Sequence, residues 1–350
     1  MKNSIIYIIL IIVCSILIIY KYSPIGQVQQ SNAFKRNFIP SKVMFEKAIR
    51  LPNHLFGFAG KLDKDIVLKS YSEQLPLFKI NYALNKLDTI SLTYPPAFRV
   101  TTNIYKNFES SNIYFTNPYS DISIYNGYKS ILFNVSGLRF DNFQPISSRT
   151  LIVRARHSYK KQLNRALVKL VLSDHVSVDK KYLLPKQVNG FFTNDGWLHY
   201  DKKSARVLYM YFYRGEFLNL DTNLNLLYVG KTIDTVRIAK IKTDIITVKT
   251  TDGRGVKEIT PTIPPRFINT YITTHNDCIY ILSALESDNK ISYNYTRNQA
   301  VDVYRIRDGK YLHSFYIPKY KGIKVNEFQI KDDTMVAIYG SYLVTYKFGE

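Results

Sequence analysis

The stretch that decides the fold is residues 300–318, which read AVDVYRIRDGKYLHSFYIP. It contains two apolar-rich runs, 300–306 and 310–317. Between them Asp308-Gly309 is a dipeptide typical of a tight turn between antiparallel strands. Valine, isoleucine, tyrosine and phenylalanine dominate both runs, and these side chains suit a pleated sheet. The stretch therefore predicts a β-hairpin.

The same pattern continues upstream and repeats along the chain. Residues 266–274 and 278–283 predict two more strands, joined by a turn at His275-Asn276-Asp277. Comparable groups of four short strands occupy residues 54–94, 100–135, 143–184 and 191–229, and a last group of three occupies 327–348. One such group cannot bury both of its faces, but a ring of groups can. This recurrence predicts an all-β, six-bladed β-propeller.

Two segments do not fit the simple repeat. Residues 231–265 are left over, and they are either an insertion, which we prefer, or a thin seventh blade. The last group lacks one strand, and Ala33–Pro40 is similar to residues 312–318, because both end in an aromatic residue, isoleucine and proline. We therefore expect Ala33–Pro40 to close the ring as the missing strand. We expect one or two helical turns in Lys42–Arg50.

The chain divides into residues 1–22 as a signal anchor or transmembrane helix, 23–50 as a connector containing the ring-closing strand, and 51–350 as the propeller. Residues 5–20 form an uncharged apolar run between Lys2 and Lys21. As a helix this run spans roughly 24 Å, slightly short for a membrane crossing and slightly long for a signal-peptide core. No A-x-A pattern follows it, which favours an uncleaved anchor over a removed signal peptide.

Lipidation at Cys14 is the less favoured alternative, because Val13 is large and the apolar run continues beyond the cysteine. We expect a single-pass protein of the cytoplasmic membrane with its body facing the periplasm or the exterior. The other cysteine, Cys278, lies in the body and cannot pair with Cys14 across an inserted anchor. The body is large enough to fold without a disulfide.

The chain is strongly basic, with a formal net charge of +21 over 350 residues. Such a charge either attracts an anionic glycan or lipid surface or is simply solvated. The densest basic runs, 154–161 and 319–324, are too short for a nucleic-acid arm. Together with the expected location outside the cytoplasm, this argues against nucleic acid as a partner.

Little in the sequence points to chemistry. Of six histidines, three lie beside acids, at 174–175, 199–201 and 275–277, and the turn positions explain them as well as a metal site does. No G-x-S-x-G motif of a nucleophilic hydrolase occurs in the sequence. We interpret Cys278 as a packing residue and the Gly-rich residues 252–255 as a turn. We therefore assign no catalytic, cofactor-binding or metal-binding residue, and no cofactor.

An aromatic run, residues 209–213, places Tyr209, Tyr211 and Tyr213 on one face of a strand and Met210 and Phe212 on the other. Packing between blades is one explanation. The alternative is a tyrosine-lined surface that binds sugar or peptide.

Three segments, 224–235, 302–318 and 342–347, resemble the TolB-like six-bladed β-propeller family of Bacteroidetes. The resemblance covers about residues 190–350. That family is largely uncharacterised, so the resemblance implies the propeller fold and an envelope location and brings no catalytic residues.

The function we expect is a membrane-anchored, extracytoplasmic scaffold or binding module for an envelope protein or a glycan, with no catalytic activity. Propellers present many loops around a rigid ring, which suits binding. The alternative is a cell-envelope hydrolase or lyase with its site in the central channel. Converging histidine and acidic side chains in the channel would favour the enzyme, whereas tyrosine, asparagine and lysine would favour binding.

Overall fold

The computed structural model describes residues 7, 10–16, 32–40, 42–52, 56–62, 65–70, 76–101, 104–117, 121–135, 137–159, 162–187, 190–249, 255–290 and 297–349. The structural statements below concern these ranges.

Six four-stranded antiparallel sheets form the body. Blade 1 contains β2 (Phe56–Leu62), β3 (Asp65–Ser70), β4 (Leu77–Asn81) and β5 (Asp88–Ile90). Blade 2 contains β6 (Tyr105–Glu109), β7 (Asn112–Thr116), β8 (Asp121–Tyr125) and β9 (Ser130–Asn134). Blade 3 contains β10 (Phe140–Ser147), β11 (Thr150–Tyr159), β12 (Gln162–Leu172) and β13 (Val176–Leu183). Blade 4 contains β14 (Gly196–Asp201), β15 (Arg206–Tyr211), β16 (Glu216–Asp221) and β17 (Leu226–Lys231).

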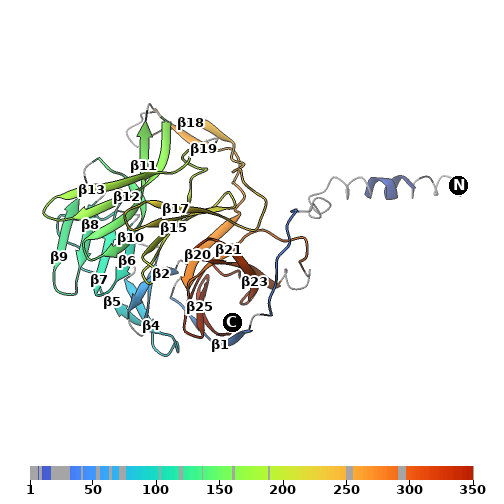
Figure 1. Ribbon diagram of the computed structural model, residues 1–350, viewed down its shortest axis with the longest axis horizontal. Helices are drawn as coiled ribbons and strands as arrows, with labels where there is room; N and C mark the ends of the chain where they lie inside the picture. Colours follow the sequence, from blue (N-terminus) through green and yellow to red (C-terminus); the bar gives the residue numbers. More distant parts are fainter. Residues whose placement is uncertain are drawn as a thin grey trace.

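Blade 5 contains β20 (Asn269–His275), β21 (Cys278–Ser283), β22 (Asn298–Arg305) and β23 (Tyr311–Pro318). Blade 6 contains β24 (Glu327–Lys331), β25 (Thr334–Tyr339), β26 (Tyr342–Gly349) and β1 (Lys42–Arg50). The first strands of successive blades contact one another, so they line the centre of the ring (Figure 1). The sequence prediction of an all-β, six-bladed propeller is confirmed.

Each blade is covered on both faces, and β15 shows how. Tyr209 and Tyr211 are fully buried against Ile152 and Leu167 of blade 3. Met210, which points to the other face, packs against the blade 5 cluster that contains Ile272. Residues 209–212 of the aromatic run therefore pack between blades, whereas the Tyr213 ring contacts Phe267. Burial on both faces also explains why these strands appear in the sequence as continuous apolar runs rather than as alternating apolar and polar residues.

Ring closure differs from the expectation in its details. The N-terminal region does supply the fourth strand of the last blade, but the strand is Lys42–Arg50, which pairs antiparallel with β26. The expected helical turns in Lys42–Arg50 are wrong. A register shift between Phe45 and Lys47 adds an extra residue to this strand and disturbs its alternation, which is why its apolar spacing resembled that of a helix.

The segment first expected to close the ring, Ala33–Pro40, instead crosses the outer edge of blade 5. It forms a single parallel bridge there, between Phe38 and Ser314, and the Phe38 ring stacks on Tyr316 with centroids 4.4 Å apart. We call residues 32–40 the strap. Because its hydrogen bonds reach blade 5 and the following residues join blade 6, the strap ties the N-terminal side of the chain to the ring.

The leftover segment is an insertion between blades 4 and 5, as preferred from the sequence. It carries a two-stranded hairpin, β18 (Thr243–Lys249) and β19 (Gly255–Pro261), which belongs to none of the blades. Figure 1 shows this hairpin at the top of the view, at about the height that the end of β11 reaches.

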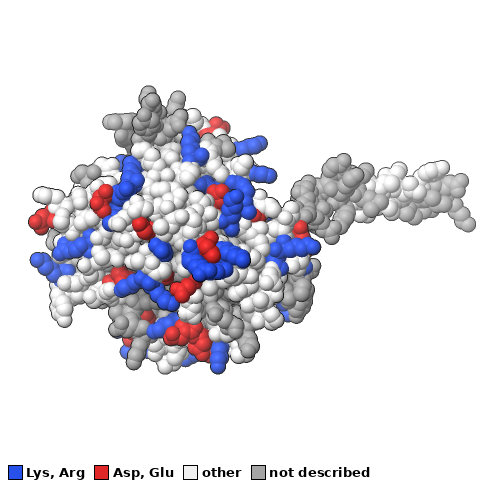
Figure 2. Space-filling view, in the orientation of Figure 1, with Lys and Arg blue, Asp and Glu red and all other residues white. Residues whose placement is uncertain are grey.

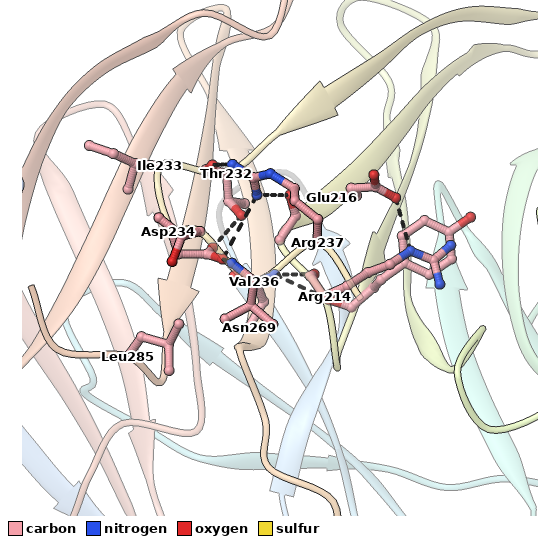
Figure 3. A network of polar contacts seen from close by, with 12 residues as sticks. Arg214, Glu216, Thr232, Ile233, Asp234, Val236, Arg237, Asn269 and Leu285 are labelled. Atoms are coloured by element: carbon pink, nitrogen blue, oxygen red, sulfur yellow. Dashed lines mark hydrogen bonds and ion pairs between the residues drawn. The ribbon is translucent and has the colours of Figure 1, made fainter. Parts of the chain in front are cut away.

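A polar network fixes the start of the insertion (Figure 3). Arg237 donates from Nη1 to the Gly215 carbonyl at 2.8 Å and from Nη2 to the Thr232 carbonyl at 3.0 Å. The buried Asp234 carboxylate accepts from the Thr232 hydroxyl and, at 2.9 Å, from the Val236 amide. Two turns that meet here, before β16 and after β17, thus share one set of hydrogen bonds.

At the N-terminus, Tyr7 and residues 10–16 are helical and exposed, and the rest of the expected anchor, 1–22, lies outside the described residues. Among the residues described, no helix has the length and apolar character needed to cross a membrane.

Candidate functional site: the central channel

A cavity of about 890 Å³ lies along the axis of the ring. Its walls are the first strands of the six blades. At one end it reaches the turns that follow these strands, including Ser110, Lys202 and Asn276. Because residues of these turns line the cavity, its mouth is at the face of the ring where the inner strands end. We call this the turn face.

The period of two in a β-strand determines which side chains reach the cavity. On β14, Trp197, His199 and Asp201 line the cavity, whereas the intervening Leu198 is buried between blades 3 and 4. Tyr200 packs against the cluster that contains Leu198 and also contributes to the cavity lining. Five aromatic residues besides Trp197 contribute to the lining, namely Phe58, Tyr105, Phe108, Tyr200 and Tyr271. Amide side chains contribute as well, namely Asn107, Asn142, Gln144, Asn276 and Gln329. The channel therefore combines aromatic surface with hydrogen-bonding groups.

Two opposite charges, the buried Glu327 and the half-buried Lys69, lie in the channel wall. The Glu327 carboxylate accepts from the Phe58 backbone amide at 2.9 Å, which links blade 6 to blade 1. Burial lowers the pKa of Lys69, and the nearby Glu327 carboxylate opposes this effect. The carboxylate thus favours the charged form of Lys69 in a place where that charge alone would be costly.

Nearer the mouth, three side chains form a directed chain of hydrogen bonds. The Thr274 hydroxyl donates to Asp201 Oδ1 at 2.8 Å, so its oxygen accepts from His199 Nε2 at 2.9 Å. Burial raises the pKa of Asp201, but hydrogen bonds from Ser204 and Thr274 outweigh it and hold the pKa below its usual range. The chain fixes the imidazole with its proton on Nε2.

The charges that line the cavity nearly cancel. Four carboxylates and three lysines line it, namely Glu109, Asp201, Asp277 and Glu327 with Lys69, Lys202 and Lys203. Two further pairs lie at the mouth, Lys202 with Glu109 at 2.6 Å and Lys203 with Asp277 at 3.6 Å. The chain as a whole is strongly basic, yet its channel is not. On the face visible in Figure 2, Lys and Arg side chains are spread over the surface rather than gathered in one place.

The histidines separate into two groups. His199 and His275 line the channel, although 75 residues lie between them in the sequence. His157 contacts Lys181, His175 is exposed on the turn before β13, and His313 lies on β23. His54 lies outside the described residues. Of the three acid–histidine pairs noted in the sequence, the channel contains those at 199–201 and 275–277.

No group of three or more histidine, cysteine, aspartate or glutamate side chains in the described part of the chain is placed to hold a metal ion. Cys278 is half-buried and packs against the core shared by blades 5 and 6. Gly255 opens β19, while residues 252–254 of the Gly-rich turn lie outside the description.

Sequence reasoning missed the channel residues as a group. Every second position of each inner strand was a candidate, but nothing local distinguished inner strands from the other three strands of a blade. The residue types contained one usable signal, because amide, aromatic and charged residues recur near the first strand of each group.

No protein-family model matches this chain, and no curated protein matches it in sequence. Among solved structures, a DUF4221 family member from Bacteroides vulgatus superposes with a TM-score of 0.53 at 12% identity, over 90% of this chain and 99% of that one. A catalytically inactive virginiamycin B lyase from Staphylococcus aureus, solved with quinupristin, gives a TM-score of 0.45 at 11% identity, over 86% and 98% of the two chains. The first likeness supports the six-bladed propeller, and at 12% identity it bears on the fold alone.

Proposed function

We propose that this chain is an envelope binding module of the TolB-like type, anchored in the cytoplasmic membrane by residues 5–20, with its propeller outside the cytoplasm. We further propose that the channel binds an uncharged glycan. The observation that carries this is the charge-balanced lining of the channel, which contains aromatic rings together with amide and hydroxyl groups. Rings pack against the CH faces of a sugar, and the polar groups serve its hydroxyls.

The charge balance decides between ligand classes. An acidic glycan in this channel would meet Glu109, Asp201 and Asp277 near the mouth, where the two lysines are already paired. An uncharged ligand leaves those ion pairs intact and needs no side chain of opposite charge to bind it. We therefore treat the ligand of the channel and any anionic surface that contacts the basic body as two different partners.

The test is a titration of the purified full-length protein in detergent with neutral and acidic oligosaccharides and with peptides. Tyr200→Ala removes an aromatic ring from the channel lining, and we expect it to weaken glycan binding about tenfold, equivalent to about 1.4 kcal/mol. Tyr128→Ala is the matched control, since Tyr128 is 97% exposed on a turn of blade 2 away from the cavity. Binding of peptides or acidic glycans alone would contradict the proposal.

The second candidate is a hydrolase or lyase, and it is favoured by one observation, the chain from His199 through Thr274 to Asp201. An imidazole held in one tautomer by a hydrogen-bonded partner is suited to general base catalysis. If this candidate holds, the protein turns over a glycan or an ester. His199→Gln then abolishes turnover, while His175→Gln, at an exposed turn, leaves it unchanged.

Membrane anchoring has its own test. Fractionated cells should contain the full-length chain in the membrane, released by detergent and not by salt or carbonate. A shortened soluble form would show instead that residues 1–22 are removed as a signal peptide.

A further inference from the structure

The chain enters the propeller beside the insertion. Asn32 is the first residue of the strap, and its carbonyl accepts from the Thr235 hydroxyl at 2.9 Å. Its amide donates to Asp288 Oδ1 at 2.8 Å and its side chain to the Glu286 carbonyl at 3.0 Å. Thr235 belongs to the insertion, and 286–288 belong to the loop between β21 and β22. The described chain therefore enters the ring beside the segment that leads from β17 to the β18–β19 hairpin.

This entry point lies opposite the channel mouth. The insertion leads into β20, so it is carried on the face of the ring where inner strands begin. The cavity opens where inner strands end. We call the first face the hairpin face. The ring thus separates a surface that receives the N-terminal chain from a surface that presents the channel.

The hairpin face exposes apolar side chains. Ile238, Ile245 and Ile263 are each more than 60% exposed. Other exposed apolar residues are Ile246, Val248 and Ile259 in the insertion and Phe267 directly after it. A two-stranded ribbon with open edges is marginal in water, and exposed apolar clusters of this kind mark contact surfaces.

Positive charge accompanies these side chains. Lys240 and Lys242 are exposed in the insertion and Arg266 directly after it, and Asp244 is an exposed acid among them. Apolar side chains flanked by basic ones suit the interface of an anionic bilayer, where the apolar groups enter and the basic groups contact headgroups. A second copy of this chain would bring like charges together across the same edges, which disfavours dimerisation through the hairpin.

We propose that the hairpin face lies on an anionic lipid bilayer, with the β18–β19 hairpin dipping into the interface and the channel mouth directed away from the membrane. The proposal rests on the proposed anchor at residues 5–20. Residues 21–31 extend to at most about 40 Å, and Asn32 fixes where that tether ends. An anchored chain therefore holds the hairpin face close to the membrane from which it emerges.

The experiment uses full-length protein reconstituted into vesicles, with an environment-sensitive NBD dye on a single cysteine. Ile246→Cys reports on the hairpin, and Leu227→Cys on β17, at the outer edge of blade 4, is the control. The native residues have matched exposure, 43% and 46%. Both variants carry Cys14→Ser and Cys278→Ser. Vesicles contain phosphatidylglycerol or only phosphatidylcholine.

With phosphatidylglycerol, we expect the dye at position 246 to emit at shorter wavelength and to resist an aqueous quencher, and the dye at 227 to do neither. High salt should reverse the effect, because it screens the lysines. Equal emission from the two positions in vesicles that have captured the protein overturns the proposed orientation and leaves the anchor intact. Failure to associate with any vesicle overturns both proposals.

A second measurement uses the unmodified chain, so that it tests the proposal even if a cysteine variant does not fold. Hydrogen exchange is compared between detergent and phosphatidylglycerol nanodiscs. Slower exchange across β18 and β19, with no change in β17, supports the contact. Unchanged exchange in the hairpin contradicts it.

Discussion

The Arg36 guanidinium binds the Asp302 carboxylate through two parallel hydrogen bonds, Nε to Oδ1 at 2.6 Å and Nη2 to Oδ2 at 2.9 Å. Both side chains are almost completely buried, and Ser314 donates a further bond to Asp302 at 2.5 Å. This pair joins the strap to β22 of blade 5. Because the strap leads directly into β1, the pair also positions the strand that closes the ring.

Removing the arginine should leave a buried carboxylate with too few partners. We expect Arg36→Ala to lower the free energy of unfolding by about 3–5 kcal/mol. Arg99→Ala is the comparison, since Arg99 is half exposed and its partner Asp121 keeps donors from Asn117 and Asn134. Urea denaturation of the two variants measures the difference. Equal losses would mean that burial of the Arg36 pair contributes nothing.

Asp121 should make stability depend on acid pH. Hydrogen bonds from Arg99, and then from Asn117 and Asn134, lower the pKa of this carboxyl although burial opposes them. Since the unfolded chain has an aspartate pKa of about 3.9, the stabilisation is present above that value and is lost as pH falls through the lower folded pKa. Below about pH 5 we expect the free energy of unfolding to fall less steeply in Asp121→Asn than in the wild type. Parallel curves would contradict this.

Gly215 is required by the network at the base of the insertion. A Cβ at this position would lie 2.4 Å from Asp234 Oδ1 and 2.5 Å from both Thr232 Oγ1 and Arg237 Nη1. We expect Gly215→Ala to lower the free energy of unfolding by about 1–3 kcal/mol, as overpacking does, and to speed hydrogen exchange over residues 232–237. Gly255→Ala is the control, because its Cβ would meet only Thr247 Cγ2, at 3.0 Å. Similar behaviour of the two variants would show that the network tolerates displacement.

How much of this fold the sequence predicts depends on how local each feature is. The turn dipeptide Asp308-Gly309 predicted a hairpin correctly, and Asn126-Gly127 lies in the turn between β8 and β9. Both glycines have positive φ, 70° and 92°. The strands could likewise be predicted from short stretches of sequence, because both faces of a blade are apolar and each strand is therefore a continuous apolar run. The ring-closing strand was missed because Lys42–Arg50 is held by pairing with β26, almost 300 residues away, and its extra residue hides the alternation.

The channel was missed for a related reason. His199 and His275 share one cavity only because blades 4 and 5 are adjacent in a ring closed by six sheets. Their sequence context, next to acids and near turns, fits an ordinary turn equally well. Residue type identified the candidates, but only the closure of the ring determines which of them meet.

The role of β1 in ring closure can be tested on a single strand. Ile49 packs against the cluster shared by blades 6 and 1, whereas Met44 on the same strand is 54% exposed. We expect Ile49→Asp to lower the free energy of unfolding by about 2 kcal/mol or more, because it removes apolar burial and brings a charge to that cluster. Met44→Asp should change it by less than about 0.5 kcal/mol. Thermal denaturation compares them, and a stable Ile49→Asp protein would show that β1 is dispensable.

The hydrogen bonds at the channel mouth lead to a prediction about the pKa of Asp201 rather than about stability. Thr274 donates one of the hydrogen bonds that keep the pKa of Asp201 low. Thr274→Val removes that donor but keeps the shape of the side chain, so burial should then prevail and the Asp201 pKa should rise. Thr274→Ser restores the hydroxyl and should return the pKa toward its wild-type value. Carboxyl ¹³C NMR titration, with Asp201→Asn to assign the signal, measures all three. If the valine and serine variants titrate alike, Thr274 does not couple Asp201 to His199, and the enzyme candidate loses the observation that favours it.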